Sequence, residues 1–269
     1  MYRIIACDLD ETLLNSDHQV SDKDVESIAR LTEMGVKFVL ATGRGYNTTF
    51  ELRKRLGLYD KEGEYTISFN GGFITENKGN RPLYKRGISF ETASALYSEA
   101  VRRNQTVHVY TEDTVYIYNY IDAERKYVEG RMPIKEIFSD NIDFLKDEPI
   151  IKELYMDTDI SRLEKIAGEI TDITAGLAVS YSSNRYLEFN SPLADKGIGL
   201  RKLAEILKVD LSETMAVGDN INDLPMLKAA GLAVGVHNSN SRITNELDIL
   251  LEASNNHDPI TEIFERFYK

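Results

Sequence analysis

Two carboxylates one residue apart follow the first apolar run of this 269-residue chain. The run Tyr2–Cys7 is rich in strand-forming residues, and Asp8 and Asp10 come directly after it. A buried parallel strand presents such residues at its carboxyl edge, where open α/β sheets bind their ligands. Two anions this close repel each other unless a cation lies between them. The spacing therefore predicts a divalent metal site that handles phosphate, and a turn or a calcium loop is the alternative.

Two further positions carry groups suited to phosphate binding. Thr42 ends a second apolar run and offers a hydroxyl, and the backbone from Gly43 onward opens a helix whose first amides suit an anion. Lys196 stands at the start of another predicted helix, where the helix dipole disfavours a cation. That placement indicates a binding role, such as holding a carboxylate and a phosphate together. An ordinary strand-to-helix turn and a solvated surface lysine are the structural alternatives.

The segment Met215–Asp223 is the strongest chemical signal after the first strand. Asp219 ends a buried strand and is placed to join a metal site. Asn222 is placed to bond a phosphoryl oxygen, and Asp223 to cap the next helix or to orient metal-bound water. Simple helix capping would explain Asp223 but not the whole run.

The elements that must position these residues alternate between strand and helix. The pattern predicts strands at 2–8, 36–41 and 65–70, with helices over about 22–35 and 46–56 between them. This order implies a parallel, doubly wound sheet. From residue 196 the same alternation resumes, with strands at 214–218, 232–236 and 247–251.

The segment 84–188 shows a different pattern of predicted elements. Two hairpins, turning at Glu112-Asp113 and Ser183-Asn184, are mixed with helices, which predicts a separate α+β domain with an antiparallel sheet. The fold class is therefore an α/β core formed by 1–83 and 189–269, interrupted by an inserted cap domain at 84–188. Ten of the fifteen tyrosines lie in this insertion, either as a lid over a small ligand or as amphipathic residues of a small sheet.

The composition limits the partners. A net charge of −12 argues against nucleic acid, although a metal and a few cations still allow a small phosphorylated ligand. The single cysteine, Cys7, excludes an intramolecular disulfide. The four histidines, His18 among them, lack the spacing of a metal site and are interpreted as structural. Because there is no bilayer-length apolar run and no signal-peptide pattern, we expect a cytoplasmic protein that does not enter a membrane.

In order and spacing these motifs resemble those of the haloacid dehalogenase superfamily. The segments Asp-Leu-Asp-Glu-Thr, Ala-Thr-Gly-Arg, Phe-Asn-Gly-Gly, Asp-Lys-Gly and Gly-Asp-Asn-Ile-Asn-Asp are similar to those of its Cof-type sugar-phosphate phosphatases. Those proteins carry a large α/β cap after the third core strand, and in this chain the pattern of predicted elements changes at the same point. Glu11, Asp195 and the run His237-Asn238-Ser239 depart from the usual pattern, and none of them removes a catalytic group.

The resemblance implies a role for each residue. Asp8 would be the nucleophile that forms an aspartyl-phosphate, and Asp10 the general acid and base. Mg²⁺ would be held by Asp8, the backbone carbonyl of Asp10 and Asp219. The phosphoryl oxygens would be bound by Thr42, Gly43, Lys196, Asn222 and the backbone amide of Leu9. Thr12 would order the turn, and Arg44 would face the cap and an anionic substrate or make a surface ion pair.

These roles together predict a Mg²⁺-dependent phosphatase that acts on a small phosphorylated metabolite under a cap that opens and closes. Two rivals remain. A phosphomutase of the same superfamily would return the phosphate to a second hydroxyl, and a non-catalytic sensor would only bind a phosphorylated ligand. The intact set of acids and the lysine disfavours the sensor, because a binding module does not need an acid–base carboxylate. The metabolite and the oligomeric state stay open.

Overall fold

The computed structural model describes residues 1–130 and 132–269. The chain forms two compact units, one made of Met1–Lys85 with Ala194–Lys269 and the other of Arg86–Leu193. The first unit is thus assembled from both ends of the chain, and the second is an insertion within it.

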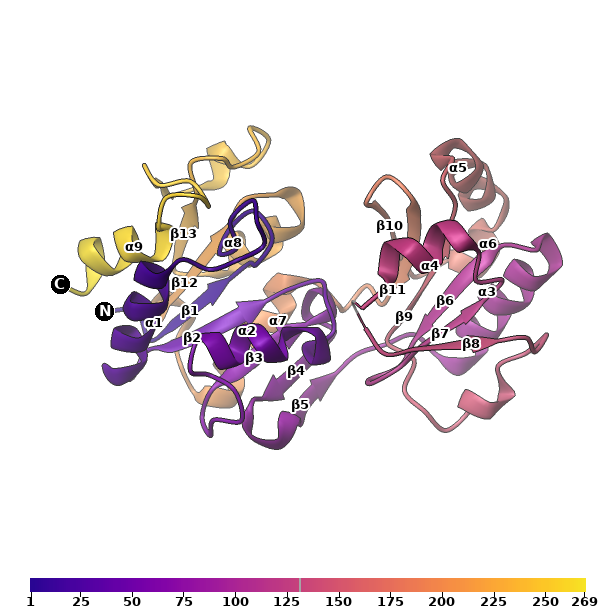
Figure 1. The fold of residues 1–269 in the computed structure, drawn as a ribbon, viewed down its shortest axis with the longest axis horizontal. Helices are drawn as coiled ribbons and strands as arrows, with labels where there is room; N and C mark the ends of the chain where they lie inside the picture. Colours follow the sequence, from indigo (N-terminus) through magenta and orange to yellow (C-terminus); the bar gives the residue numbers. More distant parts are fainter. Residues whose placement is uncertain (131) are drawn as a thin grey trace. The chain divides into compact units, whose positions relative to one another are not determined.

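The first unit contains an eight-stranded sheet in the order β14-β13-β12-β1-β2-β3-β4-β5 (Figure 1). Every neighbouring pair from β14 to β3 is parallel, whereas β4 and β5 are added antiparallel at one edge. The strands are β1 Ile4–Cys7, β2 Lys37–Ala41, β3 Tyr65–Ser68, β4 Phe73–Glu76, β5 Arg81–Lys85, β12 Thr214–Gly218, β13 Leu232–Gly235 and β14 Ile249–Leu250.

Helices join these strands, largely where the sequence predicts them. Ser21 caps α1 by accepting a hydrogen bond from the Asp24 amide. The α-helices are α1 Asp22–Glu33, α2 Phe50–Arg55, α7 Lys196–Leu207, α8 Leu224–Ala229 and α9 Pro259–Phe267. The 3₁₀ turns are η1 Tyr46–Thr49, η2 Phe69–Gly71, η3 Lys78–Asn80, η5 Leu211–Glu213, η6 Ile221–Asp223 and η7 Thr244–Glu246.

The predicted helix over 46–56 is instead the 3₁₀ turn η1 followed by α2. The hydroxyls of Thr48 and Thr49 bond the carbonyls of Gly45 and Tyr46, three residues back in each case. Such side-chain bonds compete for the carbonyls that an α-helix would use.

Helices cover both faces of this sheet. On one face Ile5 and Cys7 pack in a cluster with α1 and α9, and on the other Ile4 and Ala6 pack with α7 and α8. This alternation along β1 is the period of a strand buried on both sides, and it confirms the doubly wound core. The two chain ends meet in this unit, where the Tyr268 hydroxyl donates to the Tyr2 carbonyl at 2.9 Å (Figure 1).

The inserted unit contains a six-stranded sheet in the order β10-β11-β9-β6-β7-β8. Its strands are β6 Thr106–Tyr110, β7 Val115–Tyr118, β8 Ile134–Ile137, β9 Lys152–Met156, β10 Ala178–Ser182 and β11 Tyr186–Asn190. Its helices are α3 Phe90–Arg103, α4 Asp122–Val128, α5 Ile160–Glu169 and α6 Thr171–Thr174, with a 3₁₀ turn η4 at Asp143–Leu145.

The prediction that this second sheet is antiparallel is wrong at one edge. The strands β7 and β8 pair in parallel, so the sheet is mixed. The reason is that α4 lies between them in the chain, and a crossover helix returns the chain in the same direction. The two predicted hairpins are present, and Ser183 and Asn184 both adopt the positive φ of a tight hairpin turn.

The tyrosines Tyr97 and Tyr155 belong to the interior of the inserted unit. Both are fully buried with α3 and α5 against one face of the sheet. Their hydroxyls donate to the carbonyls of Ser139 and Leu96. These two therefore serve the packing of their own unit and not a lid.

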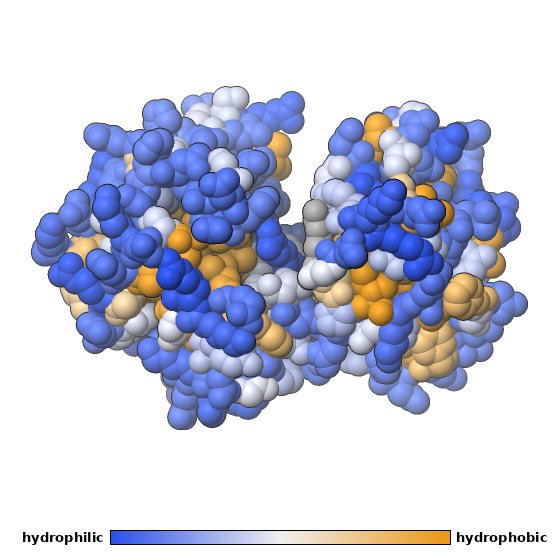
Figure 2. All heavy atoms as spheres, in the orientation of Figure 1, coloured by the Kyte–Doolittle hydropathy of each residue, from blue (hydrophilic) through white to orange (hydrophobic). Residues whose placement is uncertain are grey.

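The viewed surface of both units is mostly hydrophilic, with apolar side chains in small separate patches (Figure 2). Within the described part of the chain, no helix has the length and apolar character needed to cross a membrane.

Candidate active site

The carboxyl edge of the parallel sheet gathers the predicted acids. The central strand β1 lies between β2 and β12, so Asp8, Thr42 and Asp219 leave three neighbouring strands at the same edge. The Asp8 amide donates to the Val217 carbonyl at 2.9 Å, which extends the pairing of β1 with β12 to the first acid. All three side chains are buried. The register of three parallel strands thus brings together residues that are far apart in the sequence.

The ammonium of Lys196 lies between two carboxylates. Its Nζ donates to Asp8 Oδ1 and, at 2.6 Å, to Asp223 Oδ1, and the side chain is completely buried. The cap of α7 is provided by Asp195, whose Oδ1 accepts from the Ile198 amide at 2.7 Å. The helix dipole disfavours a cation in the first turn of α7. The charge of Lys196 is tolerated there because Asp8 and Asp223 neutralise it.

Asp223, the second acid that bonds Lys196, is itself held by backbone amides. Its Oδ2 accepts hydrogen bonds from the amides of Asp219 and Asn220 at 3.1 and 3.0 Å, which closes a capping box with Asn220. A Cβ on Gly218 would lie 2.6 Å from the Asp223 Cβ, so only glycine allows this approach. The prediction that Asp223 caps the next helix is not met by its side chain, which makes no capping bond to α8 and instead completes the capping box of η6. The bond to Lys196 is an additional contact.

The buried acids carry more negative charge than Lys196 neutralises. Carboxylate oxygens of Asp8, Asp219 and Asp223 all lie within 4.8 Å of one another. Burial raises the pKa of Asp8 to about 7, against the opposing effect of Lys196, and burial raises that of Asp219 to about 6. Burial disfavours the charge on Lys196, but Asp8 and Asp223 outweigh it and raise the pKa of the ammonium. A cluster of buried carboxylates with one cation fits a hard divalent ion that takes oxygen ligands.

Thr12 connects the turn after β1 to this cluster. Its Oγ1 donates to Asp219 Oδ1 at 2.7 Å, and the side chain is fully buried. The sequence prediction had Thr12 order the turn, with support of the site residues or contact with substrate as the alternatives, and it named no partner for the hydroxyl. The bond to Asp219 orients one of the predicted metal ligands, a relationship that spacing along the chain does not reveal.

One oxygen of Asp8 is available for chemistry. Lys196 engages Oδ1, and within the described residues no hydrogen-bond donor engages Oδ2. The backbone amides of Leu9 and Gly43 likewise find no acceptor in the described part of the chain. Both lie at the carboxyl edge of the sheet beside Asp8 and Thr42.

Asp10 is turned toward Arg44 and not toward the cluster. Arg44 Nε donates to Asp10 Oδ2 at 3.0 Å, and its Nη2 bonds Oδ1 of the same carboxylate. His18 Nδ1 lies 3.9 Å from Asp10 Oδ1. Arg44 thus makes the ion pair that was one of its two predicted roles. The neighbourhood of His18 was missed, because no spacing signal connects it to Asp10.

Asn222 lies exposed in η6, and no hydrogen bond joins it to the buried acids among the described residues. The structure therefore brings together Asp8, Thr12, Lys196, Asp219 and Asp223, and leaves the Asn222 side chain facing solvent.

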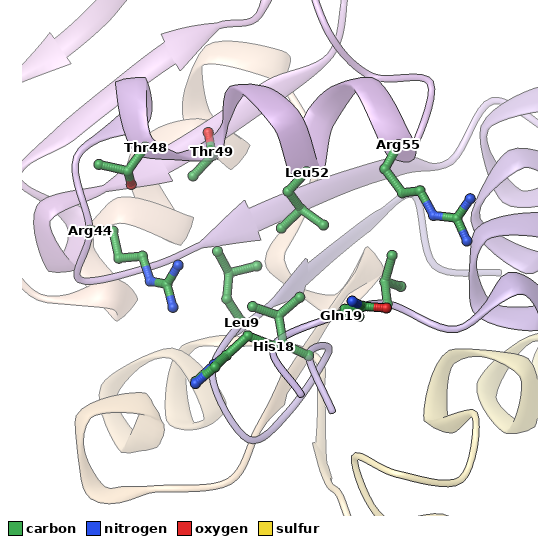
Figure 3. Close-up of a pocket in the computed structure, with 10 residues that line it drawn as sticks. Leu9, His18, Gln19, Arg44, Thr48, Thr49, Leu52 and Arg55 are labelled. Carbon is green, nitrogen blue, oxygen red and sulfur yellow. The ribbon is translucent and has the colours of Figure 1, made fainter. Parts of the chain in front are cut away.

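A cavity of about 310 Å³ is lined in part by Arg44, the residue that pairs with Asp10 (Figure 3). Arg44, Thr49 and Leu52 line it from the segment that contains α2, and His18 and Gln19 from the loop after β1. Neither the buried acids nor Lys196 line it. The cavity is thus a neighbour of the acid cluster and does not contain it.

The fold and site together define a doubly wound α/β protein with buried acids at the carboxyl edge of its central strands and an inserted cap. The chain belongs to the haloacid dehalogenase-like hydrolases, whose family model matches residues 5–264. The resemblance drawn from the sequence motifs, including the Cof type, is confirmed.

Similar proteins span the whole chain. "Putative phosphatase YxeH" of Bacillus subtilis is 27% identical over 270 residues, which cover 98% of each chain. A haloacid dehalogenase-like hydrolase from Bacteroides thetaiotaomicron has a structure with a TM-score of 0.88 and 28% identity over 100% of both chains. TM0651 from Thermotoga maritima has a TM-score of 0.89 and 26% identity, and the match covers 100% of this chain and 98% of that one.

Proposed function

We propose that this chain is a Mg²⁺-dependent phosphatase that hydrolyses a small phosphorylated metabolite, such as a sugar phosphate, through an aspartyl-phosphate. The observation that carries the proposal is the contact of Lys196 with Asp8. A completely buried ammonium holds one oxygen of a buried carboxylate, and the other oxygen has no donor among the described residues. A carboxylate fixed in this way is suited to attack phosphorus.

In the first half-reaction, Asp8 Oδ2 forms a bond to phosphorus while the bond between phosphorus and the leaving alkoxide breaks. Asp10 gives its proton to that alkoxide. In the second half-reaction, a water oxygen attacks phosphorus, its proton passes to Asp10, and the bond from phosphorus to Asp8 breaks. Inorganic phosphate leaves and Asp8 is restored.

Arg44 donates two hydrogen bonds to the Asp10 carboxylate and so holds it in position. Transfer of a proton to the alkoxide requires Asp10 to be protonated, and a protonated acid pairs less strongly with Arg44.

The phosphoryl oxygens need donors at fixed positions. Lys196, the Thr42 hydroxyl and the amides of Leu9 and Gly43 lie at the sheet edge beside Asp8 and offer such donors. Asn222 becomes a further donor only if its exposed side chain turns inward.

The residues that would hold Mg²⁺ are Asp8, Asp219 and the backbone carbonyl of Asp10. When bound, the ion reduces the repulsion between the Asp8 carboxylate and an anionic phosphate. Two residues orient the ligand Asp219. Thr12 donates a hydrogen bond to the Asp219 side chain, and Asp223 accepts one from the Asp219 backbone amide.

The test is phosphate release from a panel of sugar phosphates, nucleotides, flavin mononucleotide and pyridoxal phosphate, with Mg²⁺ and with EDTA. Release that needs the metal supports the proposal, and the ranking of the panel identifies the substrate class. Transfer of phosphate between two hydroxyls without net release would instead identify a phosphomutase. Ligand binding without either reaction would identify a sensor.

A further inference from the structure

The turn η2, Phe69–Gly71, has an unusual backbone beside the proposed phosphate site. Phe69, Asn70 and Gly71 have successive φ values of 49°, 52° and 92°. Asparagine and glycine adopt this left-handed region readily, whereas a bulky residue such as phenylalanine rarely does. Strain of this kind persists only where the surroundings impose it, and it is concentrated at functional sites.

The turn makes two backbone hydrogen bonds that flank Gly43. The Phe69 amide donates to the Arg44 carbonyl and the Asn70 amide to the Thr42 carbonyl, each at 3.0 Å. In a trans peptide the carbonyl and the following amide point in opposite directions. The bond from Asn70 to the Thr42 carbonyl therefore points the Gly43 amide away from the turn.

The neighbouring amides of this loop are already engaged. The Thr42 amide donates to the Ile67 carbonyl at 2.9 Å, and the Arg44 amide to the Thr42 hydroxyl at 3.0 Å. Only the amide between them, that of Gly43, has no acceptor in the described part of the chain. Between Thr42 and Arg44 the loop thus presents one amide that has no acceptor among the described residues, and the half-buried position of Gly43 leaves it within reach of a ligand.

The Asn70 side chain supports the loop on the same side as the turn. A Cβ on Gly43 would lie 3.1 Å from Asn70 Oδ1 and 3.4 Å from its Nδ2. The carboxamide therefore occupies the space that a side chain at residue 43 would need. Its Oδ1 is buried, and no donor among the described residues bonds it.

The same turn also contacts the helix that carries Lys196. A Cβ on Gly71 would overlap the carbonyl of Asp195, the residue that caps α7, and would lie 3.2 Å from the Gly199 amide. One strained turn is thus in contact with the Thr42 loop on one side and with the first turn of α7 on the other.

We propose that η2 is a positioning element of the phosphoryl-transfer site, in which Asn70 holds the peptide groups around Gly43 so that its amide faces a phosphoryl oxygen. The inference rests on the proposed phosphatase function. It assigns Asn70 no contact with the substrate, because the residue acts through Gly43.

The test compares Asn70→Val, Asn70→Gly and the matched control Asn104→Val. Valine disfavours the left-handed conformation, whereas glycine adopts it freely and keeps both backbone bonds. Asn104 ends α3 in the inserted unit with φ 53° and ψ 39°, nearly the values of Asn70, 52° and 40°. The control therefore reports the general effect of valine in this conformation away from the site.

The measurements are kcat with p-nitrophenyl phosphate, inhibition by vanadate with Mg²⁺, and the melting temperature. Asn70→Val is expected to lower kcat and weaken vanadate inhibition by about tenfold or more, because a displaced donor no longer meets the transferring group. Asn70→Gly is expected to lose much less, and Asn104→Val to lower only the melting temperature.

The proposal is overturned if Asn70→Val affects kcat and vanadate inhibition no more than Asn104→Val does. A glycine variant as impaired as the valine variant would also overturn it, since the backbone conformation would then not be the cause. Failure of the underlying function looks different, because the unmodified protein would release no phosphate at all.

Discussion

Thr12 Oγ1 donates a 2.7 Å hydrogen bond to Asp219 Oδ1, although 207 positions separate the two residues in the chain. The bond joins the turn after the central strand β1 to the end of its neighbour β12. Both side chains are buried. Because Oδ1 of Asp219 accepts this hydrogen bond, Oδ2 is the oxygen left available to a metal.

The first prediction concerns this bond. Thr12→Val keeps the shape of the side chain but removes the donor, so Asp219 loses the partner that orients it. Loss of such an outer partner typically weakens metal affinity by about 10–100-fold. We expect the Mg²⁺ concentration for half-maximal phosphate release to rise accordingly, and titration calorimetry with Mg²⁺ to show the same change without substrate.

The matched control is Thr12→Ser, which retains the hydroxyl and should stay close to the unmodified protein. Equal Mg²⁺ affinity in the valine variant and the unmodified protein would mean that the hydrogen bond from Thr12 does not orient Asp219 for metal binding.

The second prediction concerns the buried charge of Lys196. Lys196→Met leaves Asp8 and Asp223 facing each other without the ammonium between them. Breaking a buried pair in this way typically costs about 3–5 kcal/mol of stability. Urea unfolding should show that loss, and phosphate release should fall to background because Asp8 is no longer held.

A second substitution separates stability from chemistry. In Lys196→Met with Asp223→Asn, one of the two uncompensated acids becomes neutral, so much of the unfolding free energy should return. Turnover should not return with it. A double variant that recovers activity would show that Lys196 acts only through the fold.

The third prediction assigns the nucleophile. Asp8→Asn keeps the shape of the side chain and still accepts a hydrogen bond from Lys196, but an amide does not form the aspartyl-phosphate. The variant should fold, should retain some Mg²⁺ binding, and should show no phosphate release. Activity that survives this change would place the nucleophile elsewhere.

The fourth prediction tests Asp10 as the acid. Asp10→Asn should slow sugar phosphates, whose alkoxides need a proton, far more than p-nitrophenyl phosphate, whose phenolate leaves unaided. The comparison is the ratio of kcat for the two substrates in the variant and in the unmodified protein. An equal loss for both would contradict the acid role.

The sequence predicts the core of the fold well because its signals are local. The buried run Ile4–Cys7 and the run Lys37–Ala41 are strands with apolar side chains on both faces, and the alternation with helices implies their parallel order. The motif residues fall at the ends of these strands. Parallel order alone is thus enough to place Asp8, Thr42 and Asp219 at one edge.

The parts that were missed depend on contacts that no local pattern encodes. The edge strand β8, Ile134–Ile137, is only half-buried and short, so its alternation is weak and its parallel pairing was not foreseen. The turn at Phe69–Gly71 lies so close to Asp195 that residue 71 has no room for a Cβ, and Phe69 has no intrinsic preference for its positive φ. The partner of Thr12 is fixed only once β1 and β12 lie side by side.

The last prediction concerns stability and lies outside the active site. Asp24 in α1 is buried, and its Oδ1 accepts hydrogen bonds from the amide and the hydroxyl of Thr261 in α9 at 2.8 and 3.0 Å. Burial, opposed by the bonds from Thr261, raises the pKa of Asp24 from 3.8 to about 6. The folded protein therefore holds this proton more tightly than the unfolded chain does.

Because the folded pKa is the higher one, the contribution of Asp24 to stability is complete below pH 4 and is lost as the pH rises through 6. Two pKa units correspond to a loss on the order of 3 kcal/mol between pH 4 and pH 7. Asp24→Asn stays neutral and keeps an acceptor for Thr261, so its unfolding free energy should not fall across this window as that of the unmodified protein does.

Urea unfolding at pH 4, 5.5 and 7 measures the difference in unfolding free energy between the two proteins. Taking this difference removes the effect of every other titrating group. A constant difference between Asp24→Asn and the unmodified protein would mean that folding does not raise the pKa of Asp24.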